Sequence, residues 1–79
     1  MHERAPLDQL APGRSGRVVA LRASGPIRRR LLDLGFVPGA VVGVVRHSPL
    51  GDPTAYRVKG ALIALRHQDA AFVEMEPCP

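Results

Sequence analysis

The chain has almost no aromatic side chains and almost no cysteine. Among its 79 residues there are two phenylalanines, one tyrosine and no tryptophan, and the single cysteine is Cys78. One cysteine cannot form an intramolecular disulfide, which fits a reducing compartment. Hydrophobic residues still make up 46% of the chain, so the sequence predicts a folded domain with an aliphatic core.

Long apolar segments are also missing. The longest uncharged stretch, 35–45, is interrupted by Pro38 and three glycines, and it is well short of the ~20 apolar residues that span a bilayer. Residues 1–6 contain no apolar signal segment. We therefore expect a cytoplasmic protein that reaches the inner face of a membrane only through a partner.

Motifs of catalysis and metal binding are equally scarce. None of the three serines lies in a G-x-S-x-G turn, and there is no G-x-x-x-x-G-K-[ST] segment to bind phosphate. His2, His47, His67 and Cys78 lie far apart, without C-x-x-C or H-x-x-x-H spacing. We therefore expect no enzyme activity, no cofactor and no metal site, and we assign no role to Cys78.

One short helix is predicted among segments that otherwise resemble strands. Ser24-Gly25-Pro26 is a helix start, because Ser or Gly can cap and Pro fits the first turn. Gly35 is placed to end the helix in the left-handed conformation. The sequence thus predicts a helix over 26–34. The apolar stripe that should be buried is Ile27, Leu31 and Leu34, and the predicted surface ion pair is Arg29 with Asp33.

Short strands account for most of the remaining chain. The expected strands are 16–22, 40–46, 56–59, 61–66 and 72–76. They are separated by turns at 11–13, 48–53 and Gly60, and by a short turn or single helical turn at 67–71. The valines of 40–46 predict burial on both faces of that strand. In the last strand Val73 and Met75 should point inward, with the glutamates outward.

About five short strands with one inserted helix indicate a mainly β fold, a small closed or half-closed barrel. Closure removes the exposed strand edges that otherwise invite aggregation. The whole chain, 1–79, is expected to be a single domain with its core at about 7–76. The terminal segments 1–6 and 77–79 are expected to be loose.

The charge is unevenly distributed. The net charge is +4, and seven of the eleven basic residues lie within the first thirty positions. A basic half fits an acidic partner, whether nucleic acid, anionic lipid or protein. Because small barrels that bind single strands usually stack bases on aromatic side chains, which are rare here, we expect no nucleic-acid partner, although a nucleic-acid-binding barrel stays the first alternative.

Three segments in order resemble a known family. They are LLDLGFVPG at 31–39, SPLGDP at 48–53, and ALIALR at 61–66 followed by Asp69-Ala70. They resemble the central motif, the following loop and the closing segment of FeoA, the small cytoplasmic component of bacterial ferrous iron transport. The resemblance extends from about Leu7 to Met75, which is nearly the whole chain.

The resemblance implies an SH3-like barrel with an inserted helix. It also implies an accessory or regulatory role beside FeoB, the membrane protein that carries ferrous iron and has a cytoplasmic GTP-binding domain. The same fold occurs as the C-terminal domain of iron-dependent repressors, but a chain of this length has no room for their DNA-binding and metal-binding domains. Whether such a partner is stimulated or inhibited, and whether nucleotide or iron controls binding, stays open.

We predict two regions that contact the FeoB-like partner. One is the exposed loop formed by Leu50, Gly51, Asp52 and Pro53, which is stiffened by proline and so loses little entropy on docking. The other is the helix face that carries Arg29 and Arg30, suited to an acidic surface. Weak homo-oligomerisation through a strand edge is compatible with this hypothesis. A metal sensor built from His47 and His67 is the second alternative.

Overall fold

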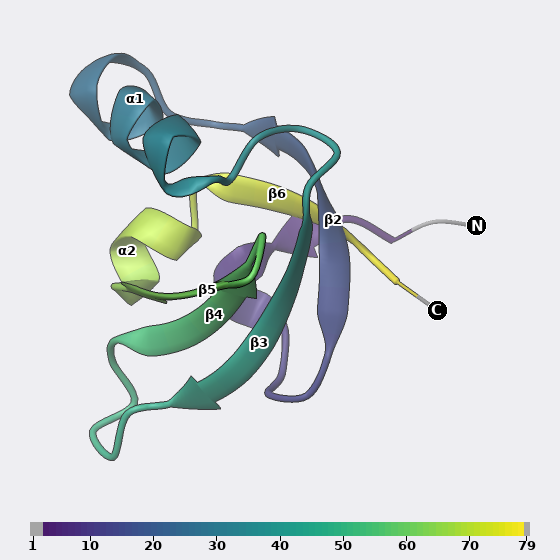
Figure 1. The fold of residues 1–79 in the computed structure, drawn as a ribbon, viewed down its shortest axis with the longest axis vertical. Helices are drawn as coiled ribbons and strands as arrows, with labels where there is room; N and C mark the ends of the chain where they lie inside the picture. Colours follow the sequence, from purple (N-terminus) through teal and green to yellow (C-terminus); the bar gives the residue numbers. More distant parts are fainter. Residues whose placement is uncertain (1–2, 79) are drawn as a thin grey trace.

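The computed structural model describes residues 3–78 and consists mainly of one strongly curved antiparallel sheet (Figure 1). Its strand order is β1-β6-β2-β3-β4-β5. The strands are β1 (Ala5–Pro6), β2 (Ser15–Leu21), β3 (Val41–His47), β4 (Thr54–Val58), β5 (Ala61–Leu65) and β6 (Val73–Pro77). The helices are a 3-10 turn (Leu7–Gln9), α1 (Gly25–Leu34) and α2 (His67–Ala70). Within residues 3–78, none of these helices is long and apolar enough to cross a membrane.

The mainly β fold with one inserted helix confirms the prediction, and the sheet has one strand more than expected. The additional strand is β1, in which Ala5 and Pro6 pair with Met75 and Glu74 of β6. At the other end Pro77 continues β6 and pairs with Gly16. The two ends expected to be loose are thus shorter than predicted. Of the other residues in these segments, Cys78 donates its backbone N–H to Ser15 O at 2.9 Å, and Nη1 of Arg4 lies 4.0 Å from Oε2 of Glu74. Residues 1, 2 and 79 lie outside the described part of the chain.

The core lies inside the curved sheet and is almost entirely aliphatic, as the composition predicts. Val73 and Met75 of β6 are fully buried, as expected. In β3 the burial on both faces that we expected is wrong. Val42 and Val44 point into the core, whereas Val41 and Val45 are exposed, because a strand on the wall of a small barrel has only one covered face. The buried hydrophobic residues are Leu7, Leu10, Val18, Leu31, Phe36, Val42, Val44, Tyr56, Val58, Leu65, Ala70, Val73 and Met75.

Helix α1 begins and ends within one residue of its predicted bounds. Gly35 ends it with φ 109°, and its N–H donates to the carbonyls of Leu31 and Leu32. A side chain at this position would place its Cβ 3.0 Å from Val58 Cγ1, so both the backbone and the packing require glycine.

The predicted burial of the whole α1 stripe is wrong at one position. Leu31 is buried and Leu34 packs partly against the core, but Ile27 is 43% exposed. Figure 1 shows α1 standing at one end of the molecule, beyond the strands. Only the C-terminal half of the helix therefore meets the core. The chain then leaves α1 through Phe36, whose N–H donates to Leu31 O at 3.0 Å and whose ring is fully buried.

Candidate partner-binding surface

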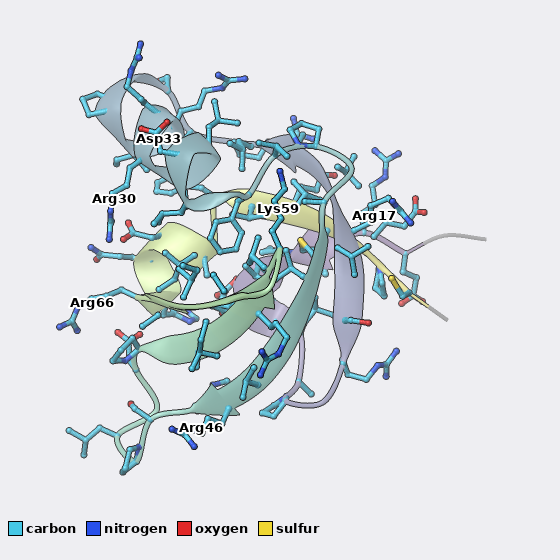
Figure 2. All side chains as sticks on the ribbon, in the orientation of Figure 1. Arg17, Arg30, Asp33, Arg46, Lys59 and Arg66 are labelled. Carbon is cyan, nitrogen blue, oxygen red and sulfur yellow. The ribbon has the colours of Figure 1, made fainter. Side chains whose placement is uncertain are left out.

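The two regions predicted to contact a partner both attach to the short helix α2. From α1, Arg30 donates through Nη1 to Oδ2 of Asp69 at 3.1 Å. From the loop, Asp52 accepts the backbone N–H of His67 at 2.8 Å, and its other oxygen lies 3.7 Å from Nη1 of Arg66. In Figure 2, Arg30 and Arg66 lie on the same side of the molecule, on either side of α2. The two regions are therefore parts of one surface centred on α2.

The loop 48–53 is a tight turn that holds the side chain of Leu50 in solvent. The N–H of Ser48 donates to Pro53 O at 3.0 Å, and the N–H of Gly51 donates to Ser48 O at 2.8 Å. Gly51 has φ 88°, in the left-handed region that favours glycine. Leu50 is 94% exposed at the tip. Gly51 and Asp52 therefore shape and anchor the loop, and Leu50 is the side chain available to a partner.

Helix α1 does not form the ion pair that its own spacing suggested. Among residues 3–78, Arg30 pairs with Asp69, and Arg29 forms no ion pair with Asp33. Asp33 and Arg29 instead line a shallow hollow on the surface of α1. The predicted i,i+4 pair is therefore wrong. The helix instead carries the tertiary ion pair of Arg30 with Asp69 of α2, which local spacing cannot reveal. Arg30 links α1 to α2 through this ion pair, and both Arg29 and Arg30 are exposed.

His47, at the end of β3, and His67, at the start of α2, have separate partners. Nδ1 of His47 lies 2.7 Å from the hydroxyl of Thr54, and Nε2 of His67 lies 3.0 Å from Oδ2 of the buried Asp8. Within the described part of the chain, no group of three or more His, Cys, Asp or Glu side chains could hold a metal ion. The contact between His67 and Asp8 was not predicted, because 59 residues separate them in the sequence and nothing local links them. His2 lies outside the described residues.

Tyr56 is a buried titratable side chain whose pKa is shifted by its surroundings. Burial is the main cause that raises the pKa of Tyr56 above its usual value of 10.0, the charges of Asp8 and Asp52 raise it further, and a hydrogen bond with Thr54 opposes them. Its ring packs edge-on against Phe36, with centroids 6.4 Å apart. The hydroxyl therefore lies among the polar groups beneath α2 and stays protonated.

The raised pKa of Tyr56 predicts that the protein loses stability at high pH. A raised pKa in the folded state means that the contribution of Tyr56 to stability is complete below about pH 10 and is lost as pH rises through the folded pKa. We expect tyrosinate absorbance to appear at higher pH in the native protein than in denaturant. The signal is specific, because the chain has one tyrosine and no tryptophan. In Tyr56→Phe the free energy of unfolding should no longer fall with pH in this way. If the tyrosine titrated at the same pH in the native and the denatured protein, its pKa would not be raised by folding.

The outer face of the sheet beside the loop is apolar with a basic rim. Leu50, Leu62 and Val45 are exposed large hydrophobic side chains on the loop, β5 and β3. A shallow hollow of ≈ 570 Å³ lies between the loop and the outer faces of β4 and β5. The cations around this face are Arg46, Arg57 and Arg66. Such a face fits a partner that offers apolar contacts and negative charge.

Comparison with known proteins identifies a family and a fold. The FeoA domain model matches residues 5–77. A fusion of Fe(2+) transport protein A and Fe(2+) transporter FeoB from Porphyromonas gingivalis is 39% identical over 70 residues, which are 89% of this chain and 8% of that protein. The chain thus spans less than a tenth of this curated relative.

Solved structures agree with this match. Iron(II) transport protein A from Clostridium thermocellum is 36% identical with a TM-score of 0.87, over 91% of this chain and 44% of that one. FeoA of Stenotrophomonas maltophilia, described as a prokaryotic SH3 domain protein and complexed with zinc, is 33% identical with a TM-score of 0.77, over 95% and 88% of the two chains. The expected SH3-like fold is confirmed. A manganese-dependent transcriptional repressor at 14% identity and TM-score 0.85, over 99% of this chain and 44% of that one, shares the fold alone.

Proposed function

The chain belongs to the FeoA family, and we propose that it is an accessory protein of ferrous iron uptake that acts from the cytoplasmic side by binding a FeoB-like membrane transporter. The main support is the fusion relative, in which a segment 39% identical to this chain shares one polypeptide with FeoB. Joining two proteins keeps them at high effective concentration, which is useful where they act on one another. Iron is the cargo of the transporter in this proposal.

The surface around α2 is the proposed contact. It combines the exposed Leu50, the exposed Arg29 and the basic rim of the β3-β4-β5 face. An aliphatic side chain on a rigid turn gains apolar burial on docking without much loss of conformational freedom. The cations favour a partner surface of opposite charge and speed association with it.

A binding experiment tests the proposal directly. The purified 79-residue chain is titrated against the cognate FeoB-like transporter in lipid nanodiscs, with and without a GTP analogue and Fe(II). Saturable binding, together with restored uptake of radiolabelled ferrous iron when the gene is returned to a deletion strain, would support it. Absence of binding in every condition, or uptake that does not depend on the gene, would contradict it.

Replacing Leu50 by alanine should weaken transporter binding without affecting folding. Burial of a leucine side chain contributes about 1.5–3 kcal/mol, so the dissociation constant should rise about 10- to 100-fold. The measurement is the same nanodisc titration, with thermal unfolding to show that the variant is as stable as the wild type.

The matched control is Val41→Ala. Val41 is also an exposed aliphatic residue, at 48%, but it lies at the opposite end of β3 from the loop. Its replacement should leave the affinity nearly unchanged. A Leu50→Ala variant that binds and supports uptake like the wild type would remove the loop from the interface.

A further inference from the structure

Strand β5 ends the sheet with an open edge. It is hydrogen-bonded to β4 on one side, and the strand order places no strand on its other side. Among the described residues, no backbone or side-chain hydrogen bond outside the β4 ladder involves Ala61–Leu65. The barrel is therefore open between β5 and β1, so of the two predicted forms it is the half-closed one.

The turn between β4 and β5 defines which backbone groups face outward. Lys59 and Gly60 both have positive φ, 50° and 82°, which is the type I′ turn of two-residue hairpins. In such a turn Val58 C=O accepts from Ala61 N–H, so Val58 and Ala61 form a hydrogen-bonded pair. Hydrogen-bonded and non-hydrogen-bonded pairs then alternate along the ladder.

The alternation leaves two residues of β5 with free backbone groups. Ala61, Ile63 and Leu65 direct their N–H and C=O groups to β4, across from Val58, Tyr56 and Thr54. Leu62 and Ala64 direct theirs away from the sheet. The open edge therefore presents two donors and two acceptors spaced as one strand of a further ladder.

Nothing in the sequence of β5 protects this edge. Natural sheets guard their edge strands with charges, proline, bulges or very short length. The opposite edge follows this rule, since β1 has two residues and one is Pro6. Residues 61–65 are Ala-Leu-Ile-Ala-Leu, with neither charge nor proline, and Leu62 is 56% exposed. Such an edge is suited to pairing with another strand.

Positive charge surrounds the edge and indicates that a strand bound there carries negative charge. Arg66 continues β5 in extended conformation and so lies on the same face as Leu62 and Ala64. Arg57 stands directly across from Leu62 on β4. Figure 2 shows Lys59 and Arg66 at the two ends of β5. Among residues 3–78, Arg57 and Lys59 take part in no ion pair, and Arg66 reaches Asp52 only at 3.7 Å.

From these observations we infer that the edge of β5 binds an extended, acidic segment of the transporter, which adds to the sheet as a seventh strand. This inference rests on the proposed function and names its contact. Backbone hydrogen bonds to Leu62 and Ala64 supply the affinity. Carboxylates of the bound segment beside Arg57 and Arg66 make the edge prefer acidic segments. A single added strand forms a small interface. Such an interface is sufficient for binding where the two partners are joined in one chain, because their effective concentration is high.

A second copy of this chain fits the edge less well. Antiparallel pairing of two β5 strands centred on Ile63 sets Arg66 of each copy opposite Gly60 of the other, next to its Lys59. Like charges brought this close oppose one another. The same cations attract an acidic segment, so charge favours the transporter over self-association.

Proline at Ala64 tests the inference. Because the N–H of Ala64 faces away from β4, Ala64→Pro removes a donor from the open edge without removing a ladder hydrogen bond, and proline is tolerated at such edge positions. The variant should stay folded and bind the transporter in nanodiscs about tenfold more weakly or worse. Ala64→Thr, which keeps the N–H, should bind within about twofold of the wild type.

The outcomes separate the inference from the proposed function. If the wild type binds and folded Ala64→Pro binds equally well, the edge inference is wrong and the function stands. If the wild type binds under no condition, the function itself fails. If Ala64→Pro does not fold, amide hydrogen exchange of the wild type gives the answer, because the Leu62 and Ala64 amides must gain protection on binding. Self-association that Ala64→Pro abolishes without weakening transporter binding would instead assign the edge to a second copy.

Discussion

Replacing Phe36 by alanine is expected to remove a large part of the stability of this domain. The ring is 0% exposed and packs edge-on against Tyr56 with centroids 6.4 Å apart. Truncating a buried phenylalanine to alanine destabilises a protein by about 3–5 kcal/mol, whereas a domain of this size has a total of only about 4–12 kcal/mol. The side chains of a packed core relax only partially around such a cavity.

The other phenylalanine of the chain provides the control. Phe72 is partly buried and packs at the margin of the core, so Phe72→Ala should cost markedly less than Phe36→Ala. Urea denaturation followed by far-ultraviolet circular dichroism gives both free energies of unfolding. Equal midpoints for the two variants would mean that the Phe36–Tyr56 contact does not organise the core.

The sequence predicts the helix well because its signals are local. Ser24 and Pro26 mark the start of α1, and Gly35 marks its end, all within a few residues of the helix they bound. The exposure of Ile27 could not be predicted in the same way. The periodic stripe shows which face of a helix is apolar. How much of that face is buried depends on where the sheet ends, and this is decided by the tertiary fold.

The contacts around α2 show the same limit for the candidate surface. Arg30 reaches Asp69 across 39 residues, and Asp52 reaches His67 across 15. The sequence predicts a short turn or single helical turn at 67–71, which the structure shows as α2. It does not predict that this helix lies between α1 and the loop 48–53 and contacts both. The strand edge of β5 was foreseen only as a general route to self-association, because the orientation of its amides follows from the turn angles at Lys59 and Gly60.

A second large loss of stability is expected when Leu31, the residue through which α1 is fixed to the core, is replaced by alanine. Leu31 is almost fully buried, and its carbonyl accepts the N–H groups of Gly35 and Phe36 at the end of the helix. Truncating a buried leucine to alanine costs about 2–5 kcal/mol. Because alanine keeps the backbone and its hydrogen bonds, this loss measures packing alone. We expect Leu31→Ala to lower the urea midpoint strongly and to weaken transporter binding in proportion to the unfolded fraction.

Ile27→Ala is the matched control within the same helix. It lies one turn earlier on the same stripe and loses an aliphatic side chain of the same size, but it is 43% exposed, so its cost should stay below about 1 kcal/mol. If both variants lost equal stability, the N-terminal half of α1 would have to be packed as tightly as its C-terminal half. If Leu31→Ala stayed fully folded and yet lost transporter binding, α1 would belong to the interface itself, and Arg29 would be the next residue to replace.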